Sequence, residues 1–136
     1  MRANGTFSVV TMQPVSAEEL SGQVGTALST GVATMEKHFA GAIAGRSETL
    51  FTSAYDSGRG IGTYVAMESF EGTVDGHSGT FNFAHSATTD GTNRRDEFFV
   101  LVPGSGTAEL AGIAGTGGLT VDADGTHRIW LDYTLG

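Results

Sequence analysis

Apolar and polar residues alternate with a period of two along almost the whole of this sequence. Successive side chains of a β-strand point to opposite faces of a sheet, so this alternation is typical of strands with one buried face. Short segments of Gly, Asp and Ser separate the alternating runs, as they do between antiparallel strands. The candidate strands are residues 4–12, 31–43, 47–55, 61–74, 79–88, 95–102, 105–111, 116–122 and 127–135. The sequence therefore predicts an all-β, antiparallel fold.

The glycine content favours the same fold class. The chain has 21 glycines among 136 residues, and each glycine destabilises a helix interior by about 1 kcal/mol relative to alanine. A helical bundle is therefore not expected. The dipeptides Asp75-Gly76, Asp90-Gly91 and Asp124-Gly125 each stand between two alternating runs. Because Asp-Gly suits the positive φ angles of tight hairpin turns, most strands should be hairpin neighbours.

An up-and-down sheet of about eight strands leaves two edges exposed unless it closes on itself. Glycines inside the predicted strands, such as Gly62, Gly72 and Gly115, suit the bends of coiled barrel strands. We therefore expect one domain over residues 1–136, an eight-stranded, closed, up-and-down antiparallel barrel. A β-sandwich is the structural alternative.

One segment interrupts the strand pattern. Residues 14–28 contain Ser16-Ala17-Glu18-Glu19, which resembles a helix capping box. Glycines in the same segment weaken any helix that begins there. We expect at most a short helix near residues 16–21, or a long loop.

Charge, cysteine content and hydropathy exclude several classes of function. The chain has 15 acidic against 7 basic residues, a net charge of −8, which opposes nucleic acid or an anionic membrane as a partner. Without cysteine there is no thiolate nucleophile, Cys-ligated zinc site, iron–sulfur cluster or disulfide. The apolar run Phe98–Val102 is too short to span a bilayer, and no secretion signal follows Met1. We expect a cytoplasmic protein.

Known cofactor and nucleophile motifs are absent from the sequence. No glycine-rich run has the spacing of a phosphate-binding or dinucleotide-binding loop, and no nucleophile elbow is present. The histidines, His38, His77, His85 and His127, show no metal-binding spacing. We therefore expect neither a cofactor nor a metal.

The hairpin expected over residues 62–89 places a carboxylate and an imidazole among aromatic residues. If its loop is Asp75-Gly76, Glu68 lies opposite Phe83 and diagonal to His85. If its loop runs from Asp75 to Ser78, Glu68 lies directly opposite His85. In both registers the two groups share one face with phenylalanines, and that face is expected to be buried.

A buried carboxylate and a buried imidazole must pair, accept other hydrogen bonds or shift their protonation. General acids and bases occur in such settings, so Glu68 and His85 are the candidate catalytic residues. The alternative is a structural polar pair. Six aromatic residues are candidate ligand-binding residues: Tyr64, Phe70, Phe81, Phe83, Tyr55 and Tyr133. By contrast, Glu36 and His38 share a strand face opposite to Lys37 and are expected to be solvated.

Several segments resemble the small bacterial proteins of the DUF3224 family, from about Phe39 to the C-terminus. They are Tyr64–Thr73, Gly76–Phe81, His85-Ser86, Val102–Ile113 and Leu131–Tyr133. The resemblance implies a barrel similar to that of allene oxide cyclase and of plant dirigent proteins. It also implies homo-oligomers and a narrow interior that binds a small apolar molecule, with a buried carboxylate that stabilises charge. Glu68 is the candidate for that role.

Three functions remain open at this point. The first is a cofactor-independent cyclase or isomerase that uses Glu68 as acid, base or electrostatic stabiliser and His85 to orient it or relay a proton. The second is a lipocalin-like carrier or sensor of an apolar ligand. The third is a structural barrel whose interior is filled by side chains.

Overall fold

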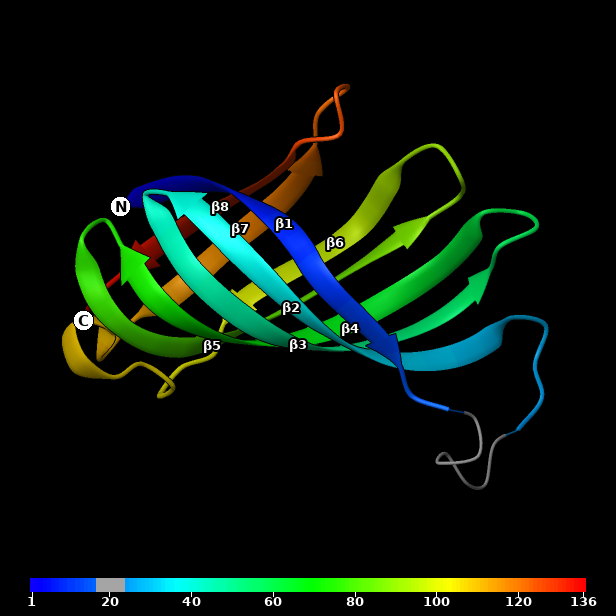
Figure 1. Ribbon diagram of the computed structural model, residues 1–136, viewed down its shortest axis with the longest axis horizontal. Helices are drawn as coiled ribbons and strands as arrows, with labels where there is room; N and C mark the ends of the chain where they lie inside the picture. Colours follow the sequence, from blue (N-terminus) through cyan, green and yellow to red (C-terminus); the bar gives the residue numbers. More distant parts are fainter. Residues whose placement is uncertain (17–23) are drawn as a thin grey trace.

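The computed structural model of the protein describes residues 1–16 and 24–136, and its strands follow one another antiparallel along the chain. The strands are β1 (Arg2–Pro14), β2 (Ser29–Gly41), β3 (Ile43–Asp56), β4 (Ile61–Val74), β5 (His77–Thr89), β6 (Arg94–Leu101), β7 (Ala114–Val121) and β8 (His127–Thr134). Each strand pairs with the next, and β8 pairs with β1, so that the eight strands form a ring (Figure 1). The predicted all-β, antiparallel class is confirmed.

The two ends of the ring differ. Both chain termini lie at one end, together with the β4–β5 turn (Figure 1), and the amino group of Met1 donates a hydrogen bond to the carbonyl of Tyr133. We call this the terminal end. The β3–β4 and β5–β6 loops, residues 57–60 and 90–93, lie at the opposite end, which we call the loop end.

The strand predicted over residues 105–111 is wrong. A short 3₁₀ helix, η2 (Ala108–Leu110), lies there between turns, although its alternating composition resembles a strand. Gly106 explains the tight turn, because a Cβ atom on it would lie 2.0 Å from the carbonyl oxygen of Leu110. Leu110 and Ile113 are buried, so this segment fills the terminal end of the ring. The helix predicted near residues 16–21 lies almost wholly outside the described residues.

The β4–β5 hairpin has the first of the two registers considered. Asp75 and Gly76 have φ angles of 49° and 82°, as a two-residue hairpin turn with two positive φ angles requires. Glu68 therefore pairs with Phe83, and Ala66 pairs with His85. This register places the Glu68 and His85 side chains diagonally on the inner face.

Inward-facing apolar side chains fill the ring from the terminal end to its middle. Phe70, Phe81, Phe83 and Phe99 form a continuous series of ring contacts, with centroids 5.1–5.9 Å apart. Aromatic pairs at such separations add to the free energy of burial. These four residues belong to the cluster of buried apolar side chains that forms the core.

Pairing around the ring is weakest between β6 and β7. Only Val100 with Thr116 and Leu101 with Gly115 are paired there, whereas β3 and β4 pair along their whole length. Toward the loop end the two strands leave a small cavity of about 70 Å³, beside His85 and Trp130.

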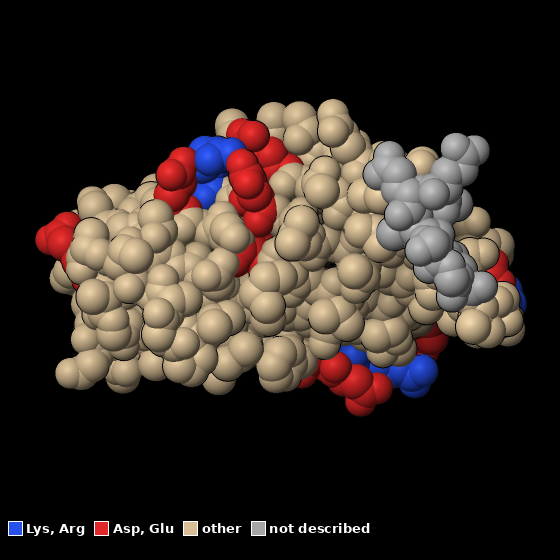
Figure 2. Space-filling model, turned by 90° about the horizontal axis from the view of Figure 1, so that it is seen from below, with Lys and Arg blue, Asp and Glu red and all other residues tan. Residues whose placement is uncertain are grey.

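On the surface, most arginines lie beside carboxylates. Arg46 contacts Glu36, Glu48 and Glu71, and Arg2 pairs with Asp132. On the face drawn in Figure 2 the basic side chains lie next to acidic ones, and wide areas carry no charge. No helix within residues 1–16 or 24–136 is long and apolar enough to cross a membrane.

Gly72 is expected to be essential for the close approach of β3 and β4. Its φ angle is 153°, and a Cβ atom on it would lie 2.0 Å from the carbonyl oxygen of Ala44. Gly72→Ala should lower the free energy of unfolding by about 2–3 kcal/mol, because the strands must separate locally. Gly104→Ala is the control: its φ is 82° with open space around the Cβ position, so only the backbone penalty of about 1 kcal/mol applies. Urea unfolding measures both variants. If Gly72→Ala and Gly104→Ala lowered the free energy of unfolding equally, the steric explanation would be contradicted.

Candidate functional site

A hydrogen-bonded cluster around Glu68 occupies the middle of the ring. Both Ser47 Oγ and Thr49 Oγ1, on β3, donate to Glu68 Oε1 at 2.7 Å. Lys37 Nζ on β2 lies 2.5 Å from Oε2, and His85 Nε2 on β5 lies 2.7 Å from it. The Glu68 side chain is completely buried, and none of the buried side-chain polar atoms in the described residues lacks a partner. The cluster is therefore a satisfied polar network.

The charges in this cluster can be assigned from the pKa shifts. Burial alone would raise the pKa of Glu68, but the hydrogen bond from His85 and the charge of Lys37 outweigh it and hold this pKa at about 2. Burial lowers the pKa of His85, and the hydrogen bond to Glu68 only partly offsets this. At pH 7 the interior therefore holds a carboxylate at Glu68 and a neutral imidazole at His85.

The direction of the hydrogen bonds follows from these protonation states. A carboxylate can only accept, so Nε2 of the neutral His85 carries the hydrogen that Glu68 Oε2 accepts. His85 Nδ1 is then an acceptor, and Tyr64 Oη, 2.8 Å away, donates to it. Arg94 Nη2 donates to Tyr64 Oη at 3.0 Å. We refer to the connected groups of Tyr64, His85 and Glu68 as the proton chain.

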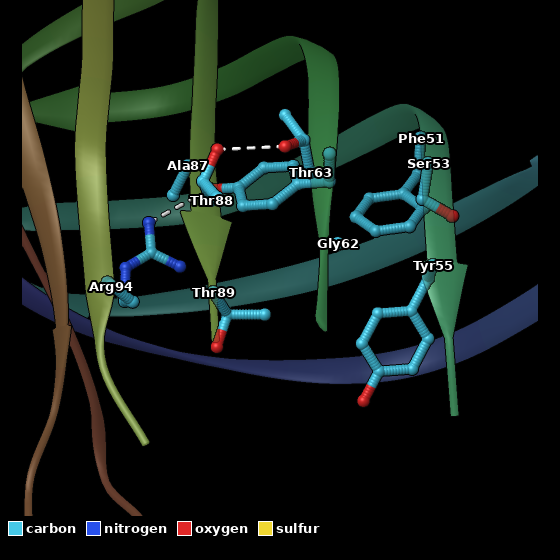
Figure 3. A pocket seen from close by; sticks show the side chains of 10 residues that line it. Phe51, Ser53, Tyr55, Gly62, Thr63, Ala87, Thr88, Thr89 and Arg94 are labelled. Carbon is cyan, nitrogen blue, oxygen red and sulfur yellow. Dashed lines mark hydrogen bonds between the residues drawn. The ribbon is translucent and has the colours of Figure 1, made fainter. Parts of the chain in front are cut away.

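The proton chain reaches a cavity at the loop end. The cavity has a volume of about 270 Å³ and is formed by β3, β4, β5 and the start of β6 (Figure 3). The Tyr64 ring stacks on that of Phe51 at 5.3 Å, and the Arg94 guanidinium lies 5.5 Å from the Tyr64 ring centroid. The cavity is lined by Phe51, Ser53, Tyr55, Gly62, Thr63, Tyr64, Ala87, Thr88, Thr89 and Arg94.

Tyr64 and Arg94 line this cavity on its β4 and β6 walls. Burial raises the pKa of Tyr64, and the hydrogen bond and charge of Arg94 oppose the rise, so the phenol is protonated at pH 7. Arg94 also donates from Nε to Glu97 Oε1 at 2.7 Å. The formal charges of Lys37, Glu68, Arg94 and Glu97 thus cancel.

The structure brings together five of the eight residues singled out from the sequence. Glu68 and His85 bond to each other, Tyr64 bonds to His85, and Tyr55 lies on the cavity wall with 45% of its surface exposed. Phe83 packs against the His85 ring at 5.8 Å.

The other aromatic candidates lie deeper in the ring or at its far end. Phe70 and Phe81 are buried in the core, on the terminal side of Glu68. Tyr133 lies at the terminal end, where its hydroxyl donates to Asp75 Oδ2 at 2.6 Å. Burial and then this hydrogen bond raise the pKa of Tyr133 to about 12.

Both cationic residues of the site, Lys37 and Arg94, were missed from the sequence, as were Ser47, Thr49 and Phe51. Lys37 is the only lysine of the chain. It lies an even number of residues from Ala33 and Phe39 on the same strand, so it shares the face on which these two residues are buried. That position could have indicated a buried lysine. For Arg94 the sequence offered no such indication. The backbone at Asp96, two residues further on, has a φ of 53°, and this interrupts the alternation from which the face of Arg94 would be assigned. The expectation for Glu36 and His38 is confirmed, since they bond to each other on the exposed face.

This arrangement can move protons with the chain's own groups. Its order is that of known catalytic triads. The phenol of Tyr64 has the place of the nucleophile or acid, the neutral imidazole of His85 that of the base, and the carboxylate of Glu68 that of the group that orients the base. Within the described ranges, no group of three or more His, Asp or Glu side chains is placed to hold a metal ion.

Acid should destabilise the fold in two stages. Since the pKa of folded His85 is below its ordinary 6.5, the unfolded chain binds this proton more readily, and stability falls as pH drops below 6.5. The pKa of Glu68 is about 2 instead of 4.5, so stability falls further from pH 4.5 downward.

Urea unfolding between about pH 8 and pH 3 measures both stages. Glu68→Gln should show a smaller loss below pH 4.5 than the unchanged protein, although exposed carboxylates such as Asp56 and Asp132, whose pKa values are also lowered, contribute in both. A free energy of unfolding that stays constant from pH 8 to 5 would contradict the first stage.

Comparison with known proteins identifies the family to which the chain belongs. The family model described as "Protein of unknown function (DUF3224)" matches residues 3–133. A crystal structure of a DUF3224 protein of unknown function from Shewanella oneidensis MR-1 is similar, with a TM-score of 0.83 and 27% sequence identity over 98% of this chain and 96% of that one. No curated protein matches. The chain therefore belongs to the DUF3224 family, whose function is unknown.

Proposed function

We propose that this protein is a cofactor-independent isomerase or cyclase that acts on a small apolar molecule by proton transfer at Tyr64. One observation carries the proposal: Tyr64 lines the cavity and its Oη bonds to His85 Nδ1 at 2.8 Å. A phenol in that position can exchange a proton with a bound molecule on one side and with an imidazole on the other.

The proposed step conserves all atoms and electrons of the substrate. A substrate C–H proton moves to Tyr64 Oη as the phenolic proton moves to His85 Nδ1, which leaves a carbanion or enolate and an imidazolium. The protons then return along the same route, and Tyr64 delivers one to a different atom of the substrate. The product is an isomer of the substrate, and no external oxidant or reductant is needed.

Glu68 acts through His85 in this scheme and does not touch the substrate. Its carboxylate is bonded to His85 Nε2 at 2.7 Å, so it fixes the tautomer and stabilises the imidazolium that forms. Lys37, Ser47 and Thr49 hold the carboxylate in place. Glu68 is therefore a positioning residue, and Tyr64 is the proposed catalytic residue.

A carrier or sensor of an apolar ligand is the second candidate function. The cavity walls are formed largely by aromatic rings and methyl groups, as in binding sites for apolar molecules. The same cavity argues against the third candidate, a ring filled throughout by side chains, because the filled part extends only from the terminal end to the level of His85 and Phe99.

Three finer features of the protein also belong to this proposal. The ring of eight antiparallel strands supports a barrel of the allene oxide cyclase type. Leu50 and Met67 are paired on the outer face of β3 and β4 and are exposed, which supports homo-oligomerisation through that face. We further propose that the protein is cytoplasmic.

Isomerisation in D2O distinguishes the enzyme from the carrier. The purified protein is incubated in D2O with an apolar small-molecule extract, and the extract is compared by chromatography and mass spectrometry before and after. We expect at least one compound to be replaced by an isomer of it in which deuterium has replaced hydrogen. A compound that binds and is recovered unchanged, without deuterium, would contradict the enzyme and favour the carrier.

A further inference from the structure

We infer that the cavity at Tyr64 and Arg94 selects an uncharged carbonyl compound with an apolar, planar body, and discriminates against carboxylates of the same size. This inference rests on the proposed function and names its substrate class. Its basis is the charge balance of the site, the direction of the Arg94 nitrogens and the composition of the cavity wall.

The charge balance argues against an anionic ligand. Lys37 is neutralised by Glu68 at 2.5 Å, and Arg94 by Glu97 at 2.7 Å. A carboxylate that enters an apolar cavity loses its hydration, which is costly unless a net positive charge replaces it. The site offers no such excess, so a neutral ligand enters at a lower free-energy cost.

Arg94 nevertheless provides a donor for one ligand oxygen. Its Nε donates to Glu97 and its Nη2 to Tyr64 Oη. The third nitrogen of the Arg94 guanidinium, Nη1, points toward the side of Thr89 in Figure 3. A carbonyl oxygen beside Nη1 would accept a hydrogen bond from a charged donor. That bond strengthens when proton removal from the adjacent carbon turns the carbonyl into an enolate.

The cavity wall fixes the shape of the rest of the ligand. Phe51 and Tyr64 are stacked with 16° between their planes, and Tyr55 and Ala87 add apolar surface. A volume of about 270 Å³ equals that of about nine water molecules at ~30 Å³ each. This space suits a single aromatic or unsaturated ring with a short side chain.

Three probes of similar size and different polarity test the inference. They are benzylacetone (a ketone), hydrocinnamate (a carboxylate) and butylbenzene (a hydrocarbon), each titrated into isotope-labelled protein and followed by NMR at Tyr64 and Arg94. We expect benzylacetone to bind about tenfold more tightly than butylbenzene, because of the charged donor, and hydrocinnamate to bind more weakly than benzylacetone.

Arg94→Met and Arg95→Met form a matched pair of variants. Both remove one positive charge from the start of β6, but Arg95 is exposed and outside the cavity wall. Arg94→Met should bring the ketone to the affinity of the hydrocarbon, and Arg95→Met should leave all three affinities unchanged. Tighter binding of the carboxylate than of the ketone, a ketone preference that survives Arg94→Met, or saturable binding of none of the probes would overturn the inference.

Deuterium exchange at the α-carbons of benzylacetone separates this inference from the proposed function. If the ketone binds as expected but its α-protons exchange with D2O no faster than in buffer, proton transfer at Tyr64 is contradicted while the ligand class stands. If exchange is accelerated but hydrocinnamate binds more tightly, the ligand class is wrong and the proton chain remains supported.

Discussion

Lys37→Met should lower the free energy of unfolding at pH 7 by about 3–5 kcal/mol, because it leaves the Glu68 carboxylate buried without its cation. Lys37 Nζ lies 2.5 Å from Glu68 Oε2, and the two side chains are only 8% and 0% exposed. Methionine has a similar length and no charge, so the change removes the ion pair with little loss of apolar contact. Urea unfolding measures the effect.

Arg46→Met is the control for loss of a positive charge as such. Arg46 contacts three glutamates, Glu36, Glu48 and Glu71, but its side chain is 38% exposed. Exposed ion pairs contribute about 0–1 kcal/mol, so this variant should be nearly as stable as the unchanged protein.

The double variant Lys37→Met with Glu68→Gln identifies the cause of the loss. Without the carboxylate there is no unpaired charge, so the double variant should recover a large part of the stability lost in Lys37→Met. If Lys37→Met costs no more than Arg46→Met, the buried ion pair does not hold the cluster together.

The β4–β5 hairpin shows how much of the fold could be predicted from the sequence. Alternation over most of residues 61–74 and the Asp75-Gly76 dipeptide restricted the pairing to two registers, and both placed Glu68 and His85 on one face. The choice between the registers depends on the turn conformation, φ of 49° and 82°, which Asp-Gly favours but does not impose. Local chemistry therefore predicted the pair, and the structure supplied its 2.7 Å bond.

The rest of the site depends on contacts between residues that lie far apart in the sequence. Lys37 on β2 and Thr49 on β3 reach Glu68 on β4 across 31 and 19 residues of sequence, and alternation gives the face of a residue but not the residue that it meets. A lysine is seldom fully buried unless it is paired, so its place on the inner face could not be accepted without its partner. Arg94 lies beyond a break in the alternation, where face assignment fails.

The turn mistaken for a strand has a comparable cause. Residues 105–111 alternate in polarity, but Ala108 has a φ of 52°, and Thr107 is tied to the neighbouring strand through Thr80 at 2.6 Å. Alternation of polarity reports which side chains are buried, not that the backbone is extended. Leu110 and Ile113 are buried because the segment covers the terminal end of the ring.

Tyr64→Phe should reduce the rate of the proposed proton transfer by about 10²–10⁴-fold, the usual contribution of a positioned acid or base. The change removes only Oη, the atom that lies 2.8 Å from His85 Nδ1 and 3.0 Å from Arg94 Nη2. The ring remains to stack on Phe51, so the affinity for an apolar ligand should change little. The rate is measured as deuterium uptake into the substrate in D2O, and the affinity by NMR titration.

Tyr55→Phe is the matched control, because it deletes the same atom from a tyrosine on the same cavity wall. Its phenol is not part of the proton chain, so its rate should equal that of the unchanged protein. The rate should also fall on the acid side in the unchanged protein, since His85 must be neutral to accept the proton, and its lowered pKa places that fall below pH 6.5. A Tyr64→Phe protein as active as the Tyr55→Phe protein would mean that the proton reaches His85 by another route, and the catalytic role of Tyr64 would have to be abandoned.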